Sequence, residues 1–225
     1  EYKDFDKALE QNPDIAFICN PSNLHVQTAV RLARIGTHLF IEKPLATDTT
    51  SLGTLEELIK KGKLVTLVGY QSRFHPACKE VKSILEKRQY GRVVSASFLW
   101  HNYLPNFHSY EDYRRSYAAR RDLGGGVTLG LSHELDLIQW LFGVPGEVYA
   151  VKGIPSLETD VEDSMMALFK CGSGKGTFPI SLSLSYAQGL EQRKFKILMQ
   201  QAVLECDLEL GYWSIAKHNE NDVST

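Results

Sequence analysis

A lysine at the end of an apolar run is the best candidate in this sequence for a group that moves a proton. Residues 39–41 are apolar without a polar break, and Glu42, Lys43 and Pro44 follow directly. Such a run predicts a strand buried on both faces, as parallel sheets require, and these sheets bind ligands just beyond the carboxyl ends of their strands. Pro44 restricts the backbone, so the charged side chains are held in fixed directions. Two interpretations stay open here: a group that moves a proton, or a solvated lysine in a turn.

Strands and helices alternate around this run over the first 74 residues. Apolar runs and helical spacing predict, in order, a helix at 4–11, a strand at 14–19, a helix at 24–35, the strand at 39–41, a helix at 47–61 and a strand at 64–70. Gly36 and Gly62 would cap the two longer helices. The alternation makes two right-handed crossover units of one parallel sheet. Because three strands are few and no Gly-x-Gly-x-x-Gly precedes Asn20, the chain is expected to enter a doubly wound sheet partway through.

The pattern changes after residue 74. The expected elements are a helix at 76–86, a strand at 92–100, a helix at 131–141, and strands at 147–153, 161–171, 175–186, 193–200, 202–208 and 211–217. A long loop, residues 101–126, separates the first strand from the second helix, and loops of that length are usually functional. The predicted fold class is α/β plus α+β: an incomplete parallel half-domain over 1–74, then an open, mainly antiparallel sheet with helices on one face over 75–225.

The composition describes a globular chain and narrows the classes of partner. Of 225 residues, 43% are apolar and 23% are charged, with a formal net charge of −2. The basic excess typical of nucleic-acid and membrane-surface proteins is absent, and no apolar run approaches the ~20 residues of a spanning helix. The chain opens without a signal peptide, and its four cysteines form no Cys-x-x-Cys pair. We therefore expect a reduced, cytoplasmic protein that binds neither nucleic acid nor membrane.

Four motifs follow one another along the chain. The first three each follow a predicted strand: Asn20-Pro21-Ser22-Asn23-Leu24-His25, Glu42-Lys43-Pro44, and Gly69-Tyr70-Gln71-Ser72-Arg73-Phe74. The fourth runs from Gly124-Gly125-Gly126-Val127 through His133-Glu134-Leu135-Asp136 to Trp140-Leu141-Phe142-Gly143. With these motifs the chain resembles, over nearly its whole length, the glucose–fructose oxidoreductase/inositol dehydrogenase/MocA (Gfo/Idh/MocA) family of NAD(P)-dependent sugar and cyclitol dehydrogenases. Residues 103–117 resemble more narrowly a branch linked to bacterial surface-sugar pathways.

The resemblance implies a partial Rossmann domain followed by an open sheet whose face meets the nicotinamide. It implies that NAD or NADP is the cofactor and that Lys43 and His133 flank the reacting carbon as catalytic residues. It also implies a set of residues that bind the nicotinamide end of the cofactor: Asn20, Pro21, Asn23, His25, Glu42, Lys43, Pro44 and Gln71. The substrate, a sugar or nucleotide sugar, is expected to contact Tyr103, His108, Arg114, Tyr117 and His133.

Hydride transfer from an alcohol requires a base for the hydroxyl proton and a fixed geometry. Lys43 suits the base, because a cationic oxidised nicotinamide and partial burial both lower the pKa of an amine. His133 is expected to share or relay the proton, since histidine titrates near neutrality. The alternative for His133 is a helix-start histidine bonded to a neighbour. Asp136, one helical turn further on, either orients His133 or caps the loop.

The loop at 101–126 interleaves tyrosines with arginines. These residue types suit an acidic or hydroxyl-rich sugar, although single-stranded nucleic acid would use the same types, and a solvated loop remains the structural alternative. Arg114 and Tyr117 are the preferred substrate residues among them. His101, His108 and Glu111 have the residue types of metal ligands, but their spacing matches no ligand motif, so no metal site is expected.

The chain departs from the family pattern in three places. The opening strands and the glycine-rich turn, which would hold the pyrophosphate on backbone N–H groups, are missing. Gly130 stands where this branch often has an aspartate, and the family's C-terminal helix is missing beyond Thr225. We therefore expect weakened or lost cofactor binding and little turnover from this chain.

The leading hypothesis is an NAD(P)-dependent oxidoreductase, or a fragment of one, that transfers hydride between the nicotinamide and a sugar or nucleotide-sugar alcohol. The alternative is a non-catalytic sugar-binding or regulatory relative on the same scaffold, which Gly130 and the missing turn favour. A third hypothesis is an assembly subunit, because a strand at 14–19 without its usual neighbours would present a bare apolar edge. We expect a homo-oligomer formed through the face or edges of the C-terminal sheet.

Overall fold

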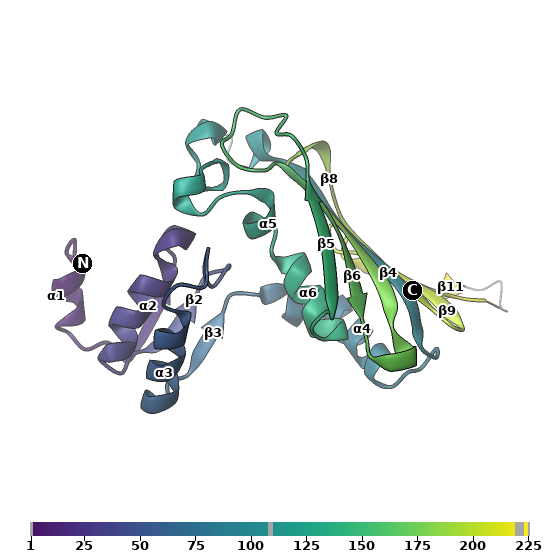
Figure 1. Ribbon diagram of the computed structural model, residues 1–225, viewed down its shortest axis with the longest axis horizontal. Coiled ribbons are helices and arrows are strands. Elements are labelled where there is room, and N and C mark those ends of the chain that lie inside the picture. Colours follow the sequence, from purple (N-terminus) through teal and green to yellow (C-terminus); the bar gives the residue numbers. More distant parts are fainter. Residues whose placement is uncertain (1, 108–109, 219–222, 225) are drawn as a thin grey trace.

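The chain folds into two units that follow each other in sequence, a small parallel sheet with helices and a large mixed sheet (Figure 1). The computed structural model describes residues 2–107, 110–218 and 223–224. Its architecture confirms the predicted fold class, α/β followed by α+β. His108, one of the predicted substrate residues, lies outside the described residues. Within the described residues, no helix combines the length and apolar character needed to cross a membrane.

The first unit alternates strands and helices as predicted. Its elements are α1 (Phe5–Leu9), β1 (Ile15–Ile18), α2 (His25–Arg34), β2 (His38–Ile41), α3 (Leu52–Gly62) and β3 (Thr66–Val68). The strands run parallel in the order β1-β2-β3. Gly36 follows α2 with a φ of +84°, as a left-handed cap should. The predicted cap at Gly62 is wrong, because Lys63 is the left-handed residue that ends α3.

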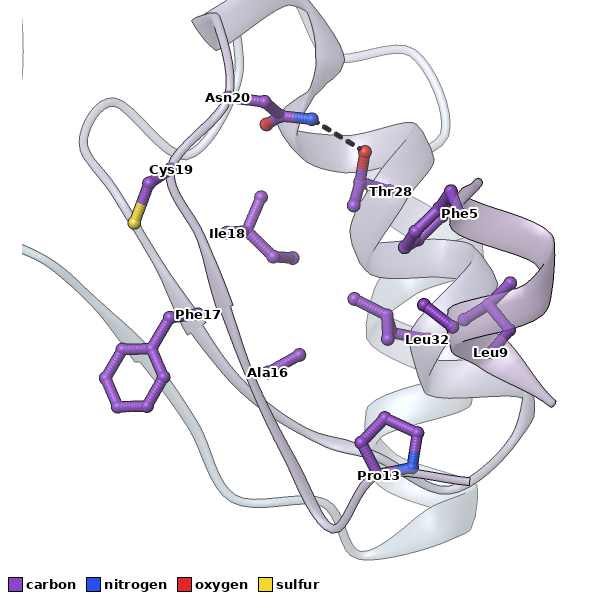
Figure 2. A pocket seen from close by; sticks show the side chains of 11 residues that line it. Phe5, Leu9, Pro13, Ala16, Phe17, Ile18, Cys19, Asn20, Thr28 and Leu32 are labelled. Carbon is purple, nitrogen blue, oxygen red and sulfur yellow. Dashed lines mark hydrogen bonds between the residues drawn. The ribbon is translucent and has the colours of Figure 1, made fainter. Parts of the chain in front are cut away.

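The described helices cover only one face of the small sheet. Ile18, Leu39 and Ile41 are buried in one cluster with residues of α2 and α3. Phe17 points to the other side of β1 (Figure 2), where 70% of it is exposed. The prediction that these strands are buried on both faces is therefore wrong, because their apolar side chains alternate between a covered face and an exposed one.

Helix α1 leaves a space beside β1. None of its residues is buried, and a pocket of about 650 Å³ lies between α1, β1 and α2 (Figure 2), lined mainly by apolar side chains such as Phe5, Leu9, Ala16 and Leu32. A lining of this kind offers little acid–base chemistry, so the chemistry suggested by Lys43 lies elsewhere.

The second unit is built on one eight-stranded sheet. Its elements are α4 (Pro76–Glu86), β4 (Val93–Tyr103), α5 (Val127–Gly130), α6 (His133–Phe142), β5 (Glu147–Lys152), β6 (Ser164–Cys171), β7 (Phe178–Ser185), β8 (Ala187–Met199), β9 (Ala202–Asp207), β10 (Tyr212–Lys217) and β11 (Val223–Ser224). The strand order is β11-β10-β9-β8-β4-β7-β6-β5. Neighbouring strands are antiparallel except β4 and β7, which run parallel.

The helices of this unit lie on one face of the sheet, the face turned toward the small unit (Figure 1). Val81 of α4 and Leu137 of α6 are fully buried in one cluster with Phe98, Leu182 and Ile197 of the strands. This packing agrees with the prediction of helices on a single face. It also fixes the start of α6, and therefore His133, against the inner side of β4 and β8.

Within the described residues, less of the region after β4 is irregular than the sequence suggested. Strand β4 continues to Tyr103, and β8 begins at Ala187, six residues before the predicted strand, so the two pair over their whole length. Four short 3-10 turns follow β4: Leu104–Asn106, Tyr113–Arg115, Tyr117–Ala119 and Arg121–Leu123. They bring the loop back over the carboxyl end of β1.

Candidate active site

The carboxyl ends of β1 and β2 meet at one pocket. It measures about 260 Å³ and is lined by Cys19, Asn20, Pro21, Ser22, His25, Glu42, Lys43 and Tyr117. Five of the eight predicted cofactor residues and one predicted substrate residue therefore share one wall. The volume is below the roughly 300–1,000 Å³ typical of pockets for whole ligands, so this pocket suits a part of a dinucleotide.

Lys43 reaches from the small unit to the large one. Its ammonium Nζ donates a hydrogen bond of 2.7 Å to the carbonyl oxygen of Gly130, the last residue of α5. Burial lowers the pKa of Lys43 from its ordinary value, the negative charges of Glu42 and Glu134 oppose that shift, and the positive charge of Arg193 adds to it. A lysine with a fixed hydrogen-bond partner and a lowered pKa is better suited to exchanging a proton than a free surface lysine.

His25 shapes the pocket wall without offering a free ring nitrogen. Its Nδ1 lies 2.7 Å from the carbonyl oxygen of Pro44, and its Nε2 lies 2.8 Å from the carbonyl oxygen of Asn20. The ring is only 1% exposed. His25 therefore ties the turn after β1 to the turn after β2, and this is a supporting role within the predicted cofactor wall.

His133 lies at the first turn of α6, buried between two aromatic rings. The ring of Tyr70 approaches it edge-on at 5.6 Å between centroids, and the ring of Trp100 lies at 6.0 Å. Burial, reinforced by the positive charges of Lys43 and Arg193, lowers the pKa of His133 from 6.5 to about 3. The expectation that His133 titrates near neutrality is therefore wrong: its imidazole is neutral at physiological pH, where it can bind a hydroxyl group without carrying charge.

Asp136 pairs with an arginine of the small unit. Its two carboxylate oxygens accept hydrogen bonds of 2.8 and 2.5 Å from Arg73, in the turn Gln71–Phe74 that follows β3. Of the two roles suggested by the sequence, this contact resembles the second, because Asp136 fixes a loop. A bidentate arginine–carboxylate pair is geometrically specific, so it sets how α6 meets the end of β3.

Sequence reasoning missed a buried ion pair directly behind His133. The Glu134 carboxylate accepts a hydrogen bond of 2.7 Å from Arg193 of β8, and the two side chains are 3% and 16% exposed. A signal was available, because Arg193 alternates in phase with Phe195 and Ile197, which face the core. An arginine at a core-facing position needs a buried partner.

The remaining predicted site residues are spread more widely. Asn23 donates to the carbonyl oxygen of Asp122, and Gln71 is exposed in its turn. Tyr103 is 36% exposed at the end of β4. Arg114 is paired with Asp112 and Glu158. Because that guanidinium is already matched by carboxylates, it is less suited to an acidic sugar than the sequence suggested.

Gly130 is explained by its neighbour Tyr186. A Cβ atom added at position 130 would overlap the Tyr186 hydroxyl. Tyr186 is 1% exposed, and its hydroxyl donates to the carbonyl oxygen of Gly126 at 3.5 Å. The aspartate expected at position 130 from the resemblance is thus excluded by a tyrosine that fills its place, and the carbonyl of Gly130 is left to hold Lys43.

Metal ligands are not gathered anywhere in the part of the chain that the structure describes: no cluster of three or more His, Cys, Asp or Glu side chains has the geometry to hold a metal ion.

Comparison with known proteins finds dehydrogenases among the relatives of this chain. By sequence, the chain is 27% identical over 149 residues to levoglucosan dehydrogenase of Pseudarthrobacter phenanthrenivorans, covering 64% of this chain and 37% of that protein. It is 24% identical over 181 residues to myo-inositol 2-dehydrogenase of Thermotoga maritima, covering 76% and 51%. The chain thus spans about a third to a half of the length of these two relatives.

Solved structures share the fold. The WlbA dehydrogenase of Bordetella pertussis, in complex with NADH and UDP-GlcNAcA, matches with a TM-score of 0.80 at 21% identity, covering 92% of this chain and 59% of that one. An inositol dehydrogenase homologue of Azotobacter vinelandii, complexed with NAD+, matches with a TM-score of 0.87 at 16% identity, covering 99% and 60%.

Family models match both units of the chain. One, described as an oxidoreductase family with an NAD-binding Rossmann fold, matches residues 1–70, and another, described as the GFO/IDH/MocA C-terminal domain, matches residues 78–205. The resemblance inferred from the four motifs is confirmed, and the chain belongs to the GFO/IDH/MocA family of oxidoreductases.

Proposed function

We propose that this chain carries the nicotinamide-facing and substrate-facing part of an NAD(P)-dependent oxidoreductase acting on a hydroxyl carbon of a sugar or nucleotide sugar. The observation that carries the proposal is the half-buried Lys43 amine, held at the carboxyl edge of a parallel sheet with its charge acting on the buried ring of His133. The levoglucosan, inositol and nucleotide-sugar relatives support the substrate class.

The pocket wall fits a nicotinamide ring. The side-chain oxygen of Asn20 is buried and has no hydrogen-bond partner among the described residues, while its nitrogen donates to Thr28 (Figure 2). An unpartnered buried acceptor is costly unless a ligand or water satisfies it, and the carboxamide of nicotinamide is a donor. In this role Asn20, Pro21, Glu42 and Lys43 hold the ring, whose chemistry when bound is to accept or return a hydride.

Lys43 and His133 divide the handling of the substrate hydroxyl. The neutral form of the Lys43 amine accepts the hydroxyl proton, and its lowered pKa makes this form easier to reach than in an ordinary lysine. Neutral His133, whose pKa is lowered by burial and by the charges of Lys43 and Arg193, positions the same hydroxyl by a hydrogen bond to its imidazole. Tyr70 and Trp100 flank the imidazole and exclude water from it.

The cofactor half of the proposal predicts an unusual order of affinities. The 225 residues contain no Gly-x-Gly-x-x-Gly turn to hold a pyrophosphate, so NADH should bind this chain less than about tenfold more tightly than reduced nicotinamide mononucleotide. Isothermal titration calorimetry with both ligands and with ADP measures this. Asn20→Ala should weaken the mononucleotide, and the matched variant Asn106→Ala, at an exposed position, should not.

A different order of affinities would contradict the proposed nicotinamide site. If ADP binds as tightly as NADH while the mononucleotide shows no heat of binding at millimolar concentration, the described pocket is not a nicotinamide site. The non-catalytic alternative makes a different forecast, namely sugar binding without hydride transfer in any variant. Gly130 no longer favours that alternative, because Tyr186 accounts for it.

We also propose that two copies of the chain meet through the outer face of the large sheet. Tyr149 and Val151 of β5 lie opposite Leu168 and Met166 of β6 in register, and all four are more than half exposed. Such a patch is a common sign of an interface. Light scattering should therefore give a dimer or larger species, which Leu168→Glu converts to monomer; a wild-type monomer at high concentration contradicts the proposal.

A further inference from the structure

The Glu134–Arg193 pair joins the candidate active site to the core of the large sheet. Besides its bond to Glu134, Arg193 donates to the hydroxyl oxygen of Ser72 at 2.8 Å, and its guanidinium lies over the indole of Trp100 at 4.0 Å from the ring centroid. Trp100 in turn lies against His133. One buried carboxylate thus fixes a guanidinium that contacts the loop after β3 and one of the two rings flanking the imidazole.

Arg193 satisfies only one of the two carboxylate oxygens of Glu134. The second oxygen of Glu134, Oε2, is buried and has no partner among the described residues, so part of its negative charge is free to act on its surroundings. The ionisable groups that interact with it are Lys43 at the end of β2, Arg193 on β8 and Cys78 on α4, and His133 precedes it on its own helix.

Each charge of the pair has a separate effect on Lys43. Burial raises the pKa of Glu134 to about 7, against the opposing influence of Arg193 and Lys43, so its carboxyl is ionised at higher pH. That charge raises the pKa of Lys43, while the charge of Arg193 lowers it. Without the Glu134 carboxylate, Glu42 would be left to oppose the lowering of the Lys43 pKa by burial and by Arg193.

We propose that Glu134 is a positioning residue of this site: it holds Arg193 against Trp100 and Ser72, and its charge offsets that of Arg193 next to Lys43. Glu134 does not touch the reacting atoms. This inference rests on the proposed function, because Lys43, whose pKa Glu134 influences, is the proposed base. The contacts themselves exist without any ligand, so the inference can be tested without turnover.

The test reads the titration of Lys43 directly. Trace labelling of amines with acetic anhydride across a pH series, followed by mass spectrometry, gives the midpoint at which Lys43 becomes reactive. Glu134→Gln should lower this midpoint by about one pH unit, the size expected when an opposite charge nearby is removed. The matched control Glu158→Gln removes an exposed carboxylate that also pairs with an arginine and should leave the midpoint of Lys43 unchanged.

A second variant covers the case in which Glu134→Gln does not fold. Coupling between two sites is reciprocal, so Lys43→Met should raise the midpoint of Glu134, read by 13C NMR of its carboxyl carbon, by the same amount. A folded Glu134→Gln protein with an unmoved Lys43, or a Lys43→Met protein with an unmoved Glu134, overturns the inference. Failure of nicotinamide binding overturns only the proposed function, because neither readout uses a ligand.

Discussion

Replacing Lys43 by methionine is expected to lower the rate of hydride transfer by a factor of about 10²–10⁴, the usual contribution of a positioned general base. Methionine keeps the length and the apolar stem of the side chain but cannot accept a proton. The pH dependence has a defined sign: only the neutral amine acts as a base, so the wild-type rate rises with pH through the lowered pKa of Lys43. In the variant this limb of the profile disappears.

The measurement is the appearance of reduced nicotinamide at 340 nm, with the protein in excess over the cofactor and a panel of sugars and nucleotide sugars as substrates. Excess protein compensates for the weak dinucleotide binding expected of this chain. Lys61→Met is the matched control, because Lys61 is exposed on α3, away from the pocket. Equal rates in the Lys43→Met and wild-type proteins would show that another group takes the proton.

Replacing Gly130 by alanine is expected to destabilise the protein by about 1–3 kcal/mol or more, the cost of overpacking a closed site. The new methyl group would overlap the hydroxyl of Tyr186, which is buried and packed edge-on against Phe107. Relief requires movement of Tyr186 or of the carbonyl that holds Lys43. Urea unfolding followed by circular dichroism measures the loss.

Two further variants separate this overlap from a general cost of losing a glycine. Gly53→Ala lies within α3 and meets no atom within 4 Å, so it should be neutral or stabilising by roughly 0.5–1 kcal/mol. Tyr186→Phe, which removes the overlapping hydroxyl, should recover part of the stability lost in Gly130→Ala. If Gly130→Ala behaves like Gly53→Ala, Tyr186 is not the reason for the glycine.

The sequence placed Lys43 correctly because the signal was local. An apolar run that stops at a charged pair before a proline identifies a strand end, and strand ends of a parallel sheet share one edge. The same local signal led to the wrong prediction that both faces of these strands are buried. An apolar run such as that of β1 looks alike whether one side or both are covered, so the exposure of Phe17 depends on packing that the run does not encode.

The buried ion pair could not be predicted from the sequence, because its two residues come from separate elements. Glu134 and Arg193 are 59 residues apart and meet only because β8 pairs with β4 behind α6. The lowered pKa of His133 has the same origin, since burial and two cations from other elements produce it. The residue type alone led us to expect titration near neutrality, whereas the charge of this histidine depends on the fold around it.

The roles of Asp136 and Gly130 also depend on residues that are distant in sequence. The spacing of Asp136 placed it on the face of His133, yet its actual partner is Arg73, from a turn on the other unit. In the sequence, Gly130 favoured a non-catalytic protein, whereas in the structure the hydroxyl of Tyr186 occupies the space that a side chain at position 130 would need. Both readings depended on a partner far away in sequence, which neither spacing nor composition could identify.

We expect the amine of Lys43 to lie beside C4 of the bound nicotinamide, the carbon that accepts the hydride when the substrate alcohol is oxidised. The most direct measurement is an intermolecular nuclear Overhauser effect from the C4 protons of reduced nicotinamide mononucleotide bound to the protein. This placement predicts cross-peaks to the side-chain methylenes of Lys43 and to the ring of His133 in the same complex. Cross-peaks confined to the exposed face around Phe17, with none to Lys43, would contradict it.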